Sequence, residues 1–427
     1  MAVFENYHRQ SLKQAPRVTM IGRWRVDYLA FNGPEGCTNA PLIVLGGAFQ
    51  NFNSYKYCVE AVLKVCPVVM VDLPSLGNNT QLAPDLGLED LADLLFQWVE
   101  FEGLQRVSLM GLSLGSVVAA TFAYKHPAFM EKLILTGILT RPRKAWRMLL
   151  EESLRVLDER RMDEFGQAVV LYLVNHARLK ETGITDITRR LFHRQMKGFN
   201  ENEQARYRIN AHRLLSVEEV LGYPDCETLV STGEYDSFTL PYENALFAAR
   251  CSNAVFTLID GSDHVPQLEK RDESVAMFSA FLSGQDVGRV KGITRLTRNQ
   301  ALSLDRRTEL RYRPHNPNGQ VVSFSHVDGM PQIDSPVEVV NFNFFGCLLR
   351  PEHLLSSVRE SCRDLILCLP DSALRIPMLV VEQGDGWLRC FFLHGNFAVA
   401  EELKKLLDNR RYCAALPHSG HRPFGAP

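Results

Sequence analysis

The chain has 427 residues, of which 22% are charged, and its 47 Lys and Arg against 49 Asp and Glu give a formal net charge of −2. This balance excludes a general affinity for nucleic acid, and the length predicts two domains rather than one core. The ten cysteines form no Cys-x-x-Cys pair and are expected to be reduced thiols of a cytoplasmic protein. We see no signal peptide and no apolar run of the ~20 residues that span a bilayer, so no transmembrane segment is expected.

Short apolar runs alternate with amphipathic patterns in the first third of the chain. The runs at residues 42–45, 68–71, 107–110 and 133–135 predict buried strands. Between them, residues 88–100 have apolar side chains at the three- and four-residue spacing of a helix. This alternation predicts an α/β fold with a parallel sheet that is covered by helices on both faces.

Between about residues 141 and 221 the pattern changes to charged amphipathic helices without a convincing strand. We expect this insertion to form a helical cap over a substrate cleft, with a helical decoration of no role in substrate choice as the alternative. Strands are predicted again at 228–232 and 255–259, followed by a helix at 274–282. The first domain is therefore expected to span residues 1–285.

A polar, glycine-containing stretch at 283–288 predicts a domain boundary, with a linker over 286–301 and a second domain over 302–427. This second domain is rich in β signals and is expected to form a small barrel. Strands are predicted at 321–327, 337–349, 377–382 and 387–393, followed by a closing helix at 401–408. The tail after Pro417 is expected to be disordered.

The most informative motif is Gly111-Leu-Ser113-Leu-Gly115, which lies between a predicted strand and an apolar helix. A serine between glycines at such a turn is typical of the Gly-x-Ser-x-Gly nucleophile elbow. The turn forces the serine into a strained conformation, and a Cβ at the flanking positions would clash with the packed strand and helix. We therefore predict that Ser113 is a catalytic nucleophile.

A serine hydroxyl needs a base, and the base needs a carboxylate that orients it. In sheets of this type the acid and the histidine follow the serine in the chain, each after a later strand. Asp236 follows the predicted strand at 228–232, and His264 follows the strand at 255–259, so these two residues are predicted to complete a triad. Glu234 and Asp263 remain as rival acids.

The oxyanion of an acyl-transfer intermediate needs hydrogen-bond donors. The backbone N–H of Leu114, directly after the serine, is one candidate, and that of Ala48 is the other. Ala48 follows Gly46 and Gly47, which would let the backbone approach a reacting acyl group closely. We expect no catalytic cofactor and no metal.

Residues 20–285 resemble the α/β-hydrolase superfamily, and the Asp72-x-x-x-x-Gly77 turn is similar to a structural turn of that superfamily. A narrower resemblance is to the hydroxyalkanoyloxyalkanoate synthases of rhamnolipid synthesis. It rests on Asp72-Leu-Pro74, the Gly47-Ala48 loop and the stretch 203–207. The resemblance implies an ester or a 3-hydroxyacyl thioester as acyl donor, with an acyl carrier protein as a candidate partner.

The segment 305–311 carries three arginines before the β-rich region, and guanidinium groups bind phosphates and stack on bases. With residues 341–346 it resembles the Arg-x-x-x-Arg and Asp/Asn-x-Ser-x-x-Gly pattern of PilZ domains, over about residues 300–410. An asparagine replaces the usual serine. The resemblance implies that cyclic di-GMP binds as a regulatory ligand. The candidate nucleotide-binding residues are Arg306, Arg307, Arg311, Asn341, Asn343 and Gly346.

The sequence thus predicts a serine acyl hydrolase or acyltransferase that is regulated by cyclic di-GMP. The alternative is a non-enzymatic effector, in which the nucleotide controls docking of a protein partner in motility or biofilm formation. A basic linker attached to a barrel is the simpler alternative for the arginine-rich segment.

Overall fold

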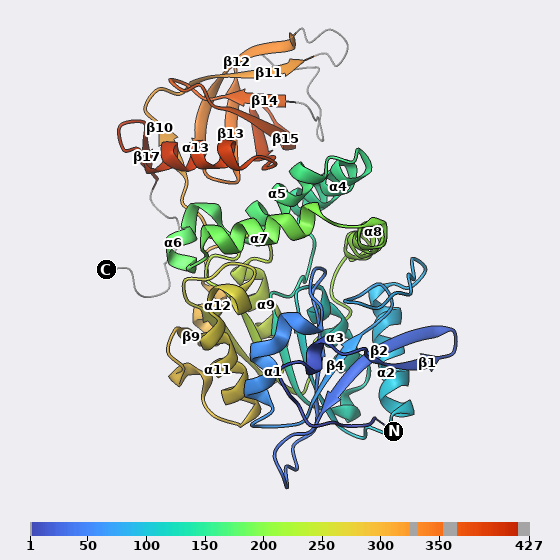
Figure 1. The fold of residues 1–427 in the computed structure, drawn as a ribbon. Helices are drawn as coiled ribbons and strands as arrows, with labels where there is room; N and C mark the ends of the chain where they lie inside the picture. The colour runs from blue at the N-terminus through green and yellow to red at the C-terminus, as the bar shows by residue number, and fades with distance from the viewer. Residues whose placement is uncertain (1, 325–330, 353–364, 417–427) are drawn as a thin grey trace.

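The computed structural model describes residues 2–324, 331–352 and 365–416 (Figure 1). A sheet-based unit lies at the bottom of Figure 1, a layer of helices in the middle and a small β-domain at the top. Within these described ranges, no helix combines the length and apolar character that crossing a bilayer requires. The expected disordered tail after Pro417 lies outside the described residues.

A nine-stranded sheet forms the centre of the first unit, in the order β1-β2-β4-β3-β5-β6-β7-β8-β9. Strands β3 to β8 run parallel to their neighbours among themselves, whereas β1, β2 and β9 pair antiparallel at the two edges. The strands are β1 (Arg17–Ile21), β2 (Trp24–Phe31), β3 (Leu42–Leu45), β4 (Val68–Asp72), β5 (Val107–Leu112), β6 (Met130–Thr136), β7 (Glu227–Gly233), β8 (Ala254–Ile259) and β9 (Ile293–Leu296).

The six strands predicted in this region are confirmed as β3 to β8. The linker expected over 286–301 is wrong in part, because this stretch contributes strand β9, which pairs with β8, and helix α12 (Arg298–Leu302). Strand β9 is short and only half of its residues are buried, so its sequence lacks the continuous apolar run that marked the other strands.

Alternate side chains of β3 serve two separate cores. Ile43 and Leu45 pack with α2 and α3, whereas Leu42 and Val44 pack on the opposite face with α1 and α11. The two-residue period of a strand therefore buries both faces of the sheet. The helices of this unit are α1 (Lys56–Val62), α2 (Leu88–Phe101), α3 (Leu114–Lys125), α9 (Pro241–Arg250), α10 (Pro266–Glu269), α11 (Arg271–Leu282) and α12.

The helices predicted between β6 and β7 are confirmed and form the middle layer in Figure 1. Helix α7 begins after Thr185, whose hydroxyl accepts the N–H of Thr188, and α8 begins with a capping box of Asn200 and Glu203. We call this layer the cap. It comprises α4 (Lys144–Asp158), α5 (Met162–Leu173), α6 (Leu179–Thr182), α7 (Asp186–Lys197) and α8 (Glu201–Leu215).

The C-terminal domain contains a closed antiparallel barrel in the order β11-β14-β15-β16-β13-β12, in which β12 pairs back onto β11. The run predicted at 337–349 is divided by a tight turn into the end of β12 and the start of β13. The elements are β10 (Tyr312–Pro314), β11 (Asn318–Phe324), β12 (Pro331–Phe342), β13 (Gly346–Pro351), β14 (Leu365–Cys368), β15 (Arg375–Gly384), β16 (Trp387–Phe392), α13 (Phe397–Asp408) and β17 (Cys413–Ala415).

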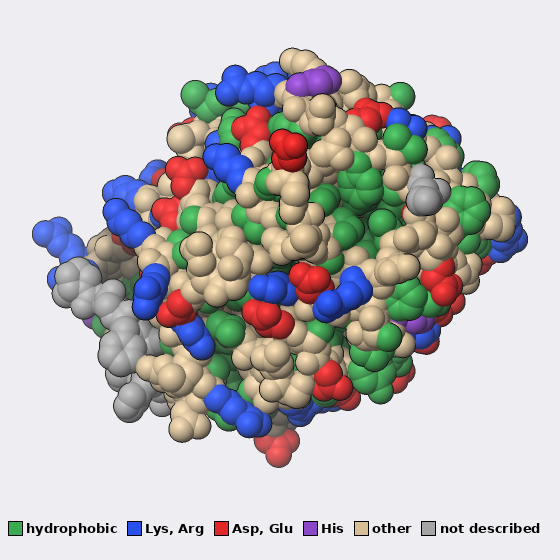
Figure 2. Space-filling view, turned by 90° about the horizontal axis from the view of Figure 1, so that it is seen from below, with side chains coloured by type: hydrophobic (Ala, Val, Ile, Leu, Met, Phe, Trp, Pro, Cys, Tyr) green, Lys and Arg blue, Asp and Glu red, His purple; other side chains and the backbone are tan. Residues whose placement is uncertain are grey.

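The cap and the barrel share buried contacts. Leu171 of α5 is fully buried in the core of the barrel, and Met148 of α4 packs on Leu379 and Val381 of β15. On the face of the molecule in Figure 2, acidic and basic side chains are interspersed, in keeping with the net charge of −2. The cap is thus packed between the sheet and the barrel.

Candidate active site

Ser113 lies at the turn between β5 and α3, as the sequence predicted. Its backbone has φ 51° and ψ −117°, a conformation that a residue with a side chain adopts only under strain. A Cβ added at Gly111 would lie 2.4 Å from the carbonyl oxygen of Gly115, and one added at Gly115 would lie 2.4 Å from that of Leu45. The close approach of strand, helix and neighbouring loop therefore requires both glycines of the motif.

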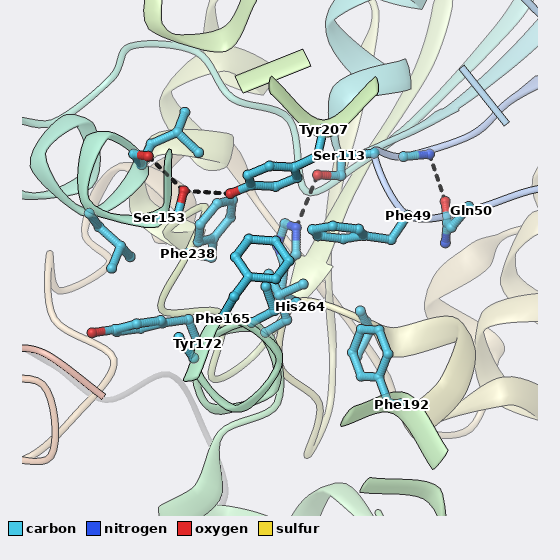
Figure 3. A pocket seen from close by; sticks show the side chains of 18 of the residues that line it. Phe49, Gln50, Ser113, Ser153, Phe165, Tyr172, Phe192, Tyr207, Phe238 and His264 are labelled. Carbon is cyan, nitrogen blue, oxygen red and sulfur yellow. Dashed lines mark hydrogen bonds between the residues drawn. The ribbon is translucent and has the colours of Figure 1, made fainter. Parts of the chain in front are cut away.

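The structure brings the three predicted triad residues together at the ends of the parallel strands. The Oγ of Ser113 lies 3.1 Å from Nε2 of His264 (Figure 3). On the other side of the ring, Nδ1 of His264 lies 3.0 Å from Oδ2 of Asp236. Asp236 follows β7 and His264 follows β8, and these two strands are neighbours in the sheet. The arrangement allows Nδ1–H to donate to the carboxylate while Nε2 accepts the proton of the serine hydroxyl.

Asp236 is fully buried and surrounded by donors. The hydroxyls of Thr232 and Thr239 donate to its Oδ2 at 3.0 and 2.8 Å, and the N–H groups of Phe238 and Thr239 donate to its Oδ1 at 2.9 and 2.7 Å. Burial by itself would raise the pKa of Asp236, but attraction to His264 and these hydrogen bonds outweigh it and lower the pKa. The carboxylate is therefore ionised at neutral pH and can fix the imidazole.

The two rival acids occupy other positions. Asp263 accepts the N–H of Ser237 at 3.2 Å, and burial together with the negative charge of Asp236 raises the pKa of Asp263 well above its ordinary value. Glu234 accepts the N–H of Gly261 at 2.9 Å. Among the contacts of the described residues, Asp236 is the acid that lies within hydrogen-bonding distance of the His264 imidazole.

The loop after β3 lies against the elbow, as expected for an oxyanion site. A Cβ added at Gly47 would lie 3.3 Å from the Cβ of Ser113, and Ala48 lines the same cavity as the serine. The N–H of Leu114 belongs to the first turn of α3 and has no acceptor within the helix. Gln50, which the sequence did not single out, accepts the N–H of Gly47 at 2.7 Å and holds the turn (Figure 3).

A cavity of about 270 Å³ opens beside Ser113 and His264. It is larger than the ~150 Å³ cavity that can hold a benzene molecule. Most of its lining is apolar, and about half of the lining residues come from the cap. From the sequence we could expect the cap as a cover, but not which of its residues line the cavity. The aromatic residues that Figure 3 labels around the cavity are Phe49, Phe165, Tyr172, Phe192, Tyr207 and Phe238.

Two cap helices share a polar contact inside this apolar lining. The hydroxyl of Tyr207 on α8 lies 2.5 Å from the hydroxyl of Ser153 on α4, and the Tyr207 ring stacks on Phe49 with ring centroids 5.6 Å apart. Tyr207 ends the cap stretch that carried the narrower sequence resemblance. These contacts join two cap helices to the loop after β3 above the reacting groups.

The predicted nucleotide-binding residues are divided between two kinds of position. Arg306, Arg307 and Asn343 line a second cavity of about 140 Å³, together with Arg143 of the cap and Phe238 of the first unit. The lining of this cavity combines residues of the barrel with residues of the first unit and the cap. The guanidinium group of Arg306 lies over the ring of Tyr242, 5.2 Å from its centroid. No group of three or more candidate metal ligands occurs among the residues that the structure describes.

The remaining residues of the pattern have contacts within the barrel. Arg311 donates to the Oδ1 of Asn341 at 2.5 Å. The Oδ1 of Asn343 accepts the N–H groups of Phe345 and Gly346, both at 3.0 Å, so the asparagine that replaces the usual serine stabilises the β12–β13 turn. A Cβ at Gly346 would lie 2.3 Å from the carbonyl oxygen of Cys390, so strand packing alone requires this glycine.

A family model of the alpha/beta hydrolase fold matches residues 40–271, which is more than half of the chain. The chain therefore belongs to the alpha/beta hydrolase fold family. This fold, together with the hydrolases among its relatives, identifies the chain as an enzyme of the hydrolase type. The match ends before the C-terminal barrel begins, so the barrel lies outside it.

Two curated relatives are distant. The putative carbamate hydrolase RutD of Caulobacter sp. (strain K31) is 22% identical over 235 residues, which are 53% of this chain and 84% of the relative. The (E)-2-((N-methylformamido)methylene)succinate hydrolase of Acinetobacter baylyi is 25% identical over 114 residues, which are 26% of this chain and 43% of the relative. The chain thus spans less than half the length of this second relative.

Two solved structures show the same fold. The alpha/beta hydrolase MGS-M2 from a deep-sea metagenome library has a TM-score of 0.55 at 16% identity, covering 63% of this chain and 98% of that structure. A thermophilic esterase from Thermogutta terrifontis has a TM-score of 0.52 at 20% identity, covering 64% of this chain and 98% of that structure. At these identities the likeness concerns the fold.

Proposed function

We propose that the chain is a serine acyl hydrolase or acyltransferase that acts on an ester or a 3-hydroxyacyl thioester. The observation that carries this proposal is the hydrogen-bonded chain from Ser113 through His264 to Asp236 at the edge of an apolar cavity. The two curated relatives described above support the proposal, because both are named as hydrolases.

In this mechanism the Oγ of Ser113 attacks the acyl carbonyl, and Nε2 of His264 takes the hydroxyl proton and returns it to the leaving group. The ionised carboxylate of Asp236 stabilises the imidazolium that forms. A positioned base of this kind contributes about 10²–10⁴ in rate. The N–H groups of Ala48 and Leu114 receive the oxyanion, each donor worth about 10²–10³ in turnover. Water or a hydroxyl acceptor then releases the acyl group.

Labelling with a phosphonofluoridate tests the nucleophile. We expect one phosphonyl group on Ser113, detected by mass spectrometry of peptides, and no label in Ser113→Ala. Ser153→Ala is the matched control, because Ser153 lines the same cavity and should leave the label in place. A folded protein that carries the label on Ser153, or none at all, contradicts the proposal. Turnover of p-nitrophenyl esters and acyl thioesters then identifies the acyl donor.

We propose further that the C-terminal barrel is a PilZ-type module that binds cyclic di-GMP. The support is the placement of Arg306 and Arg307 with Asn343 around one cavity, since a guanidinium group can bind a phosphate through two parallel hydrogen bonds. Calorimetry should show binding that weakens more than tenfold in Arg307→Ala. Arg350→Ala is the control, because Arg350 is exposed on β13 and pairs with Glu338. No heat from the wild-type protein would remove this part of the proposal.

The non-enzymatic effector remains the rival to the enzyme proposal, because it too would bind cyclic di-GMP. The hydrogen-bonded triad argues against it, because a docking surface has no need of an aligned serine, histidine and carboxylate. A Ser113→Ala strain with an unchanged cellular phenotype would favour the effector.

A further inference from the structure

The cavity beside Ser113 is lined in part by the C-terminal barrel. Leu393, His394 and Gly395, which connect β16 to α13, line it together with residues of the sheet unit and the cap. These three residues lie far beyond the matched hydrolase region in the sequence. The barrel is therefore part of the candidate substrate pocket and not only an appended domain.

Tyr172 of α5 holds this connecting loop against the cap. Its hydroxyl donates to the carbonyl oxygen of Phe392 at 2.7 Å and accepts the N–H of His394 at 2.9 Å. The Tyr172 ring stacks on Phe391, with ring centroids 5.7 Å apart. In Figure 3 Tyr172 lies on the side of the cavity away from Gln50. A single buried hydroxyl of the cap thus binds the backbone on both sides of Leu393.

Further contacts fix the same loop from both sides. The N–H of Leu393 donates to the carbonyl oxygen of Pro377 in β15 at 2.7 Å. The N–H of Phe397 donates to Oε1 of Gln167 in α5 at 2.7 Å. A Cβ at Gly395 would lie 2.4 Å from the side chain of Glu164. The loop is therefore bound to both the barrel and the cap and lies close against α5.

We propose that residues 393–395 form the far wall of the acyl pocket, and that the barrel thereby sets the length of acyl chain that the site accepts. The inference rests on the proposed acyl substrate and deepens it. Because the wall belongs to the second domain, a movement of the barrel on the cap would change acyl-chain selectivity without touching the reacting groups.

Substitutions at Leu393 can either enlarge or reduce the space at the end of the pocket. Leu393→Ala removes three carbon atoms from the side chain, so the preferred acyl chain should become about two methylenes longer. Leu393→Phe enlarges the side chain and should move the preference shorter. Each methylene that finds or loses room is worth roughly fourfold in affinity or in kcat/KM. Leu406→Ala is the control, because Leu406 is a partly buried leucine of the same domain outside the cavity.

The experiment measures two profiles over linear chains of four to sixteen carbon atoms, with the full-length protein. The first is kcat/KM for p-nitrophenyl esters. The second is the binding of free fatty acids to proteins that carry Ser113→Ala, followed by displacement of a fluorescent fatty acid. We expect Leu393→Ala and Leu393→Phe to shift both profiles in opposite directions, and Leu406→Ala to retain the wild-type optimum.

The two readouts separate the wall from the chemistry. If no variant hydrolyses esters but the binding optimum shifts, the wall is supported and ester hydrolysis is removed from the proposed function. If Leu393→Ala folds as wild type and both optima stay in place, the wall is refuted, and absence of fatty-acid binding at every length also refutes it. Should Leu393→Phe fail to fold, Tyr172→Phe replaces it. Loss of the hydroxyl removes the two hydrogen bonds that hold the loop, so kcat/KM for the longest chains should rise at least fourfold relative to wild type.

Discussion

Replacing Asp236 or Asp263 by asparagine separates the two acids that the sequence left in competition. An asparagine at 236 has one acceptor and one donor atom, so its NH₂ group must face either the imidazole and threonine hydroxyls or the two backbone N–H groups. Hydroxyls can rotate, so the first orientation is favoured. The Nδ1 of His264 would then accept a hydrogen bond, Nε2 would carry the proton, and the base for Ser113 would be lost.

This change of tautomer should lower kcat by about 10³–10⁴, which corresponds to about 4–5.5 kcal/mol of transition-state stabilisation. Asp263 offers the opposite case. Burial and the negative charge of Asp236 raise the pKa of Asp263 well above its ordinary value. Its Oδ1 accepts the N–H of Ser237, and the oxygen of an amide can accept the same hydrogen bond. We expect Asp263→Asn to keep kcat within about threefold of wild type.

The assay is hydrolysis of a short p-nitrophenyl ester at pH 8, with thermal unfolding to verify that both variants are folded. Phosphonate labelling gives the fraction of reactive sites. If folded Asp263→Asn lost as much activity as Asp236→Asn, or Asp236→Asn stayed within tenfold of wild type, the assignment of Asp236 as the orienting acid would be refuted.

Two further predictions concern stability. Gly115→Ala should lower the free energy of unfolding by more than about 3 kcal/mol, because its Cβ would meet a backbone oxygen at 2.4 Å. The control Gly87→Ala has only an ordinary contact at 3.4 Å and should lie within about 1 kcal/mol of wild type. Urea unfolding measures both, and equal stability of the two variants would contradict the clash. Burial lowers the pKa of His394 to about 4 in the folded protein, whereas the unfolded chain has the ordinary histidine pKa of about 6.5. Between these two pH values the unfolded chain is protonated at this histidine and the folded protein is not. About 3 kcal/mol of stability should therefore be lost as the pH falls from about 6.5 to 4. His394→Gln should flatten this part of the stability profile, and an unchanged slope would refute the argument.

The sequence by itself determined the local features of the hydrolase unit. The strands β3 to β8 follow from apolar runs whose alternate side chains fill two cores, and the elbow follows from glycines at 111 and 115 that no larger residue could replace. The order of serine, acid and histidine placed Asp236 and His264 after neighbouring strands. Short edge strands such as β9 escaped prediction, because a half-buried strand of four residues has no distinctive period.

The tertiary structure decided which side chains meet. Asp236 rather than Asp263 faces the imidazole, although both follow strands at the same sheet edge, because only the loop after β7 turns its carboxylate toward Nδ1. Asn343 and Gly346 proved to stabilise a turn and a strand contact of the barrel. The wall at residues 393–395 depends on Tyr172 reaching a segment that is distant in the chain. Such contacts are set by the packing of whole domains, which no local pattern of residues encodes.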